Sequence, residues 1–164
     1  MNTHHAISPK DRTTDAPEDV AVFQDFITYR MSRVQAQLNA QAGAVLRAHA
    51  DLTPARWRIL SLIAGGAPTR LVDICRLSGM DKGQVSRNLS RLVDSGLLKT
   101  ERDASDLRSQ RIEITPEGRD LVDRLFPIMR ARHEYLLNQI EPDDLDALRR
   151  ALALLEKASG RRDF

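Results

Sequence analysis

The sequence predicts a mainly α-helical fold with one small β-hairpin, and two patterns indicate this. Apolar residues recur at spacings of three, four and seven over most of the chain, which is the period of amphipathic helices. After the middle of the chain the period changes to two, where Ile112 and Ile114 alternate with charged residues. The predicted order is four helices, a hairpin and two further helices.

Length and composition limit the class of protein. The chain has 164 residues, 41% of them apolar, which is enough for one domain with a core. Residues 1–18 are polar and are expected to form a disordered arm. No stretch of 18 apolar residues and no signal peptide is present, so we expect a cytoplasmic protein. The single cysteine, Cys75, excludes an internal disulfide framework and a multi-cysteine metal site within one chain.

The first two helices are bounded by clear start and stop signals. The first runs from Val20 to about His49 and is a long amphipathic helix. Thr53 is placed to cap the second helix, and Pro54 fits the first helical position. Gly65 and Gly66 are expected to end it, with Trp57, Leu60 and Ile63 on one side.

Two short helices joined by a tight turn follow. Thr69 is predicted to cap the first, whose inner face would carry Leu71, Ile74 and Cys75 before the stop at Ser78-Gly79. Asp81 is predicted to cap the second, which ends before Gly96 and buries Val85, Leu89 and Leu92. The pattern is typical of a helix-turn-helix.

The remaining chain predicts a hairpin and two long helices. Residues 97–102 and 109–114 would be the strands, with a polar turn at 103–108. Thr115 and Pro116 start a helix that we expect to reach Ile140 and to be kinked at Pro127. Pro142 opens the last helix, in which leucines are spaced like a coiled-coil seam: Leu145, Leu148, Leu152 and Leu155.

These elements predict a winged helix-turn-helix domain over residues 51–115. The helices at 19–50 and 116–158 have apolar stripes that are more easily buried between two copies than within one small domain. We therefore expect a helical dimerisation region, a homodimer, and a short tail at 159–164.

The exposed face of the helix after Asp81 is the main candidate site. Its polar residues are of the types that read base edges in a major groove, where Arg favours guanine and Gln or Asn favours adenine. Lys82 and Arg91 are placed for phosphates. The alternative interpretation is an ordinary solvated face. The candidate residues are Lys82, Gln84, Ser86, Arg87, Asn88 and Arg91.

The hairpin adds further candidates. Arg108 lies at the predicted tip, where an arginine can enter a minor groove. Arg102 and Arg111 lie on the strands, and Asp106 is placed to orient a guanidinium. A local salt bridge in the turn is the alternative. The net charge of +2 is modest, but residues 69–111 hold 9 Lys/Arg against 6 Asp/Glu, while residues 112–164 hold 9 against 11.

Four segments together resemble the MarR family of bacterial regulators. They are residues 52–60 (LTPARWRIL), 80–87 (MDKGQVSR), 96–98 (GLL) and 103–118 (DASDLRSQRIEITPEG), and the similarity covers about residues 20–158. The wing pattern D-x-x-D-x-R followed by I-T-x-x-G is the most specific part. Leu107 stands where the family usually has the middle arginine of Asp-Arg-Arg, so one DNA contact is expected to be missing.

The resemblance implies a DNA-binding transcriptional regulator without cofactor. Such proteins usually repress, bind a pseudo-palindromic operator as homodimers, and are often released by a small aromatic or phenolic effector between the dimerisation helices and the winged domain. Candidate effector residues are Tyr29, Arg30, His49, Arg56 and Trp57, although Trp57 also suits a core position and His49 a surface position. Cys75, on an inner helix face, is expected to be an inert buried thiol.

The sequence lacks the motifs of an enzyme. Its four histidines, His4, His5, His49 and His133, form no H-E-x-x-H pair, and G-x-S-x-G and Walker A motifs are absent. We therefore predict neither a catalytic role nor a metal site. The alternative function is a winged-helix protein-interaction module that binds no specific DNA sequence.

Overall fold

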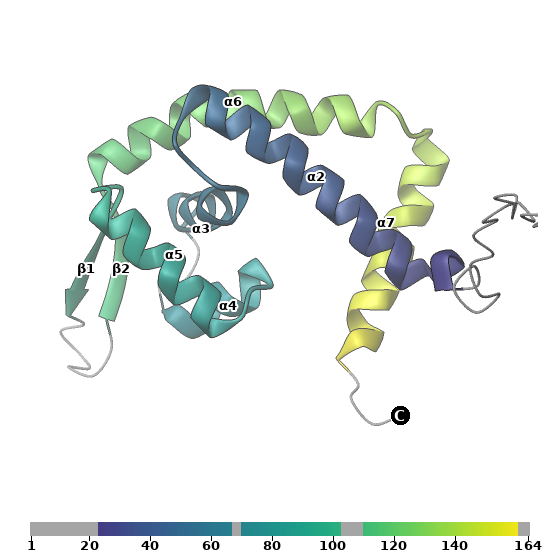
Figure 1. Cartoon of the computed structure of the whole chain (residues 1–164), viewed down its shortest axis with the longest axis horizontal. Helices are drawn as coiled ribbons and strands as arrows, with labels where there is room; N and C mark the ends of the chain where they lie inside the picture. The colour runs from purple at the N-terminus through teal and green to yellow at the C-terminus, as the bar shows by residue number, and fades with distance from the viewer. Residues whose placement is uncertain (1–22, 67–69, 103–109, 161–164) are drawn as a thin grey trace, which may run out of the picture. The chain divides into compact units, whose positions relative to one another are not determined.

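The computed structural model describes residues 23–66, 70–102 and 110–160. It divides into two compact units, Met1–Ala40 and Gln41–Phe164, with the boundary inside helix α2. The predicted order of helices and strands is confirmed (Figure 1). The described elements are α2 (Ile27–His49), α3 (Pro54–Ala64), α4 (Leu71–Ser78), α5 (Lys82–Asp94), β1 (Leu98–Arg102), β2 (Gln110–Ile114), α6 (Pro116–Leu137) and α7 (Pro142–Ser159).

The first unit holds the start of α2 and a small aromatic cluster. Of the helix predicted from Val20, residues 20–22 lie outside the described part, and Phe26 interrupts the helix that follows. The amide of Phe26 donates to the carbonyl of Phe23 at 3.1 Å, a tighter turn than an α-helix makes. The ring of Phe23 lies 4.9 Å from that of Tyr29, and this contact spans the break.

The core of the second unit joins every element from the end of α2 to the first half of α6. Leu46, Ile59, Leu60, Ile74, Val85 and Leu92 have no exposed side-chain surface. Helix α3 packs on α4, α5, α6 and β2, and α5 also packs on β1. Leu60 and Ile63 of α3 and the predicted inner residues of α5 are therefore confirmed as core, while Trp57 is half-buried against it.

Capping residues set the helix starts as the sequence indicated, with one exception. Thr53 accepts a hydrogen bond from the amide of Arg56 at 3.2 Å, and Pro54 takes the first helical position. Helix α4, however, starts after Arg70, whose side chain makes no capping bond, and the predicted cap Thr69 lies outside the described residues. The guanidinium of Arg58 donates to the carbonyl of Ser78 at 3.1 Å and so ties α3 to the end of α4.

The hairpin strands are antiparallel, with Leu98 opposite Ile114 and Thr100 opposite Ile112. Gly96, with a φ of 72°, ends α5, and the amide of Leu97 returns to the carbonyl of Leu92 at 3.0 Å. The hairpin thus begins directly beside the end of α5 (Figure 1).

The start of helix α6 is also anchored at the end of α5. The hydroxyl of Thr115 donates to the carbonyl of Gly96 at 2.7 Å and accepts from the amide of Gly118 at 3.0 Å. At Gly118 a Cβ atom would lie 2.2 Å from the carbonyl oxygen of Leu97. The sequence I-T-x-x-G is therefore a packed junction in which no side chain fits at the glycine.

The two last helices differ in burial. Helix α6 continues through Pro127 and ends at Leu137, so Ile140, which we expected inside it, lies in the turn that follows. The side chains of α7 are exposed except for the half-buried Leu145, and its leucine stripe is open: Leu148, Leu152 and Leu155. Among the described helices, none has the length and hydropathy that crossing a membrane requires.

Replacing Gly118 by alanine tests the junction between the hairpin and α6. The added methyl group would strike backbone, which cannot rotate away, so we expect Gly118→Ala to lower the free energy of unfolding by about 2 kcal/mol or more. Gly160→Ala is the control, because a Cβ there would make an ordinary contact at 3.6 Å. Urea unfolding measures both. An unchanged midpoint for Gly118→Ala would contradict the described packing.

Candidate nucleic-acid interface

Helix α5 owes its orientation to three core residues and its start to one cap. Val85, Leu89 and Leu92 face the core with exposed fractions of 0%, 8% and 0%. The carboxylate of Asp81 accepts from the amide of Gln84 at 2.8 Å, which satisfies one of the free amides of the first turn. The opposite face of the helix is consequently held towards solvent.

The predicted base-reading residues lie together on that face. Lys82, Gln84, Ser86, Arg87 and Arg91 are exposed, as the helical spacing predicts. Asn88 is half-buried, and its amide nitrogen donates to the carbonyl of Gln84 in its own helix at 2.8 Å. It is therefore less available to a ligand than its neighbours.

The outer face of the hairpin carries alternating charges. Lys99 is opposite Glu113, and Glu101 is opposite Arg111. The ammonium of Lys99 pairs with the carboxylates of Glu101 and Glu113, and the guanidinium of Arg111 lies 3.6 Å from the carboxylate of Glu113. The hydrogen bonds of Lys99 to Glu101 and Glu113 raise the pKa of the lysine, and the pKa of Glu101 is lowered chiefly by its bond to Lys99. These exposed pairs keep the hairpin charges close to balance.

The remaining hairpin candidates stay predictions. Asp106 and Arg108 lie outside the described residues, and Arg102 is described as the last residue of β1 without its side chain. Arg111 is exposed on β2 and is engaged with Glu113. A DNA contact by Arg111 therefore requires this ion pair to loosen or to be shared.

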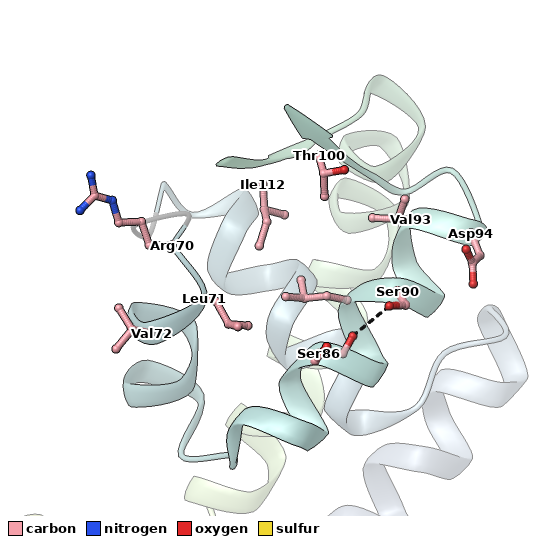
Figure 2. A pocket seen from close by; sticks show the side chains of 10 residues that line it. Arg70, Leu71, Val72, Ser86, Ser90, Val93, Asp94, Thr100 and Ile112 are labelled. Carbon is pink, nitrogen blue, oxygen red and sulfur yellow. Dashed lines mark hydrogen bonds between the residues drawn. The ribbon is translucent and has the colours of Figure 1, made fainter. Parts of the chain in front are cut away.

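A groove that the sequence analysis missed separates α5 from the hairpin and the start of α4 (Figure 2). It has a volume of about 650 Å³. Its apolar floor includes Leu71, Leu89 and Ile112, while Ser86 and Ser90 line the α5 side. The hydroxyl of Ser90 donates to the carbonyl of Ser86 at 3.2 Å, and the guanidinium of Arg70 points away from the other side chains drawn.

The helical spacing of the sequence predicts only the outer face of α5 as a candidate site, and it does not predict the groove. Ser86 belongs to both the outer face and the groove, so a molecule in the groove would lie beside the candidate interface.

A smaller cavity of about 310 Å³ lies between α3 and α6. Ser61 and Ala64 line it from α3, and Arg119, Val122 and Phe126 line it from α6. The hydroxyl oxygen of Ser61 is buried and makes no hydrogen bond within the described part of the chain. The guanidinium of Arg119 donates to the carbonyl of Ala64 at 2.6 Å and closes the end of α3.

The five predicted effector residues lie on neither of these cavities. Trp57 is half-buried against the core, the alternative position that the sequence suggested, and His49 is the exposed last residue of α2. Arg56 is half-buried in the first turn of α3. Tyr29 and Arg30 belong to the first unit, where the guanidinium of Arg33 lies 6.0 Å from the centre of the Tyr29 ring.

Helices α3 and α4, the capped helix α5 with its polar outer face, and the paired strands β1 and β2 define a winged helix-turn-helix protein. The family model for the MarR family matches residues 50–109. An uncharacterised helix-turn-helix transcriptional regulator of Bacillus subtilis, YkoM, is 29% identical over 105 residues, which are 64% of this chain and 66% of that protein, just under two thirds of its length.

Solved structures share the fold. The repressor CouR bound to a 23-mer DNA duplex has a TM-score of 0.72 and 25% identity, covering 82% of this chain and 94% of CouR. Bordetella bronchiseptica BpsR has a TM-score of 0.73 and 23% identity, covering 85% of this chain and 97% of BpsR. The family model, the Bacillus subtilis relative and the solved structures agree with the resemblance to the MarR family of transcriptional regulators seen in the sequence.

Proposed function

We propose that the chain is a ligand-responsive repressor that binds a pseudo-palindromic DNA operator as a homodimer. The observation that carries the proposal is the orientation of α5, whose core residues Val85, Leu89 and Leu92 leave Lys82, Gln84 and Arg87 exposed beside the hairpin. A helix of this kind fits a major groove, with the hairpin near the adjoining minor groove. CouR, which shares the fold, is known bound to a DNA duplex.

Two copies are proposed because α7 exposes an apolar stripe. Leu148, Leu152 and Leu155 are each at least 40% exposed, and at helical spacing they share one side. Burying such a stripe against a second copy removes it from water and places two α5 helices in one particle. A two-fold symmetric protein matches an operator with inverted half-sites.

The proposed effector is a small aromatic or phenolic molecule. The DNA binding of BpsR is regulated by 6-hydroxynicotinic acid, a hydroxylated aromatic acid. In the second unit Arg56 is proposed to hold a carboxylate and Trp57 to face a ring, with His49 as a further candidate. Tyr29 and Arg30, in the first unit, remain candidates from the sequence alone.

Replacing Arg87 by alanine tests the DNA-binding proposal. We expect Arg87→Ala to weaken specific binding about tenfold or more, because a bidentate arginine contact to guanine contributes roughly 1–3 kcal/mol. Arg108→Ala should weaken binding less. The measurement is fluorescence anisotropy with DNA from upstream of the chain's own gene and a scrambled duplex, at several salt concentrations.

The matched control is Arg150→Ala, which removes the same charge from the exposed face of α7. It should leave the preference for the upstream DNA unchanged. Equal, weak binding of the unchanged protein to both duplexes would instead support the protein-interaction alternative.

A charge placed in the α7 stripe tests the homodimer. The unchanged chain should sediment at about 37 kDa, twice its mass of 18.5 kDa. We expect Leu152→Asp to shift the protein towards monomer, because a carboxylate in an apolar interface is costly to bury. Ala153→Asp, which adds the same charge on the polar side of α7, should leave the dimer intact. A monomer at all micromolar concentrations would contradict the proposal.

Release of DNA by a hydroxylated aromatic acid tests the effector proposal. Titrating 6-hydroxynicotinic acid into the DNA complex should lower the anisotropy, and Arg56→Ala should reduce this response while leaving DNA affinity unchanged, because Arg56 is absent from the proposed DNA-contacting set. A response that Arg56→Ala leaves unaltered would exclude the proposed role of this residue.

A further inference from the structure

Gly83, in the first turn of α5, lies beside the side chains of Arg87 and Asp81. A Cβ atom at this position would lie 3.2 Å from Nη1 of Arg87 and 3.3 Å from Oδ1 of Asp81. Both contacts are tighter than ordinary van der Waals contact. The guanidinium of Arg87 therefore lies over the space that the missing side chain leaves open.

Helix geometry explains why Arg87 reaches this space. Residues four apart lie on the same helix face, and side chains lean towards the start of the helix. The guanidinium of Arg87 is thus directed back over Gly83, towards the carboxylate of Asp81, which caps the helix and carries the opposite charge. The two groups lie on either side of the position that a Cβ atom at residue 83 would take.

We propose that Gly83 is a positioning residue that sets the direction in which Arg87 meets a base edge. The inference rests on the proposed DNA-binding function. In the free protein the far end of Arg87 is flexible and exposed, so it would yield to a new methyl group at little cost. In the proposed DNA complex two hydrogen bonds to a base would hold the guanidinium, which could not then yield without losing them. The cost of a side chain at residue 83 therefore falls on the DNA complex.

Folding and binding should respond to Gly83→Ala in opposite ways. Alanine favours helix more than glycine does, so the melting temperature should stay equal or rise. The affinity for the operator should nevertheless fall about fivefold, in the range of the coupling between contacting residues. Binding to a scrambled duplex should stay unchanged, because phosphate contacts from Lys82 and Arg91 do not depend on Arg87.

A double-mutant cycle is the test. Gly83→Ala is measured in the unchanged chain and in Arg87→Ala, by anisotropy against operator and scrambled duplexes. We expect the fivefold loss in the unchanged chain and no further loss in Arg87→Ala. Gly83→Ser, which adds the same Cβ atom, should give the same pattern.

Two results would overturn the inference about Gly83 while leaving the proposed DNA-binding function in place. One is an operator preference that Gly83→Ala leaves intact, and the other is an equal loss with and without Arg87, which would mean that residue 83 acts on DNA directly. Failure of the unchanged chain to prefer the operator would remove the proposed function as well, so the two failures are distinguishable.

Discussion

The packing of three side chains of α5 into the core determines which residues the protein offers to a partner. Val85, Leu89 and Leu92 are almost fully buried, and each contributes roughly 1.5–3 kcal/mol that would be lost on exposure. Rotating α5 far enough to hide Arg87 would expose at least two of them. The polar face is thus held outwards by apolar packing, and the charges on that face remain free to serve binding.

The position of the hairpin depends on a second constraint at the end of α5. The positive φ of Gly96 turns the chain into β1, and Thr115 bonds back to the carbonyl of Gly96 where β2 leads into α6. Gly118 lets α6 approach the carbonyl of Leu97 closely. Strands that begin and end at this junction stay beside α5, so the helix and the hairpin form one surface.

The features that could be predicted from sequence are those with local causes. Caps at Thr53, Asp81 and Thr115 and the apolar spacing of α5 each act within one helix, and the structure confirms them. The start of α4 at Arg70 lacks a side-chain cap, and the ring contact across Phe26 marks a break that periodicity does not record.

Features assembled from several elements were not predicted. The groove beside α5 combines residues of α4, α5 and both strands, so no single stretch of sequence encodes it. The space over Gly83 was also missed, because it depends on the path of the Arg87 side chain and not on the spacing of apolar residues.

Selection of bound duplexes from a random DNA pool measures whether α5 reads bases. We expect the unchanged chain to enrich an inverted repeat, and Arg87→Ala to lose the preference at one symmetric pair of positions while keeping the rest of the repeat. Enrichment of no sequence, or of the same repeat with every position unchanged in Arg87→Ala, would contradict the assignment of α5 as the recognition helix.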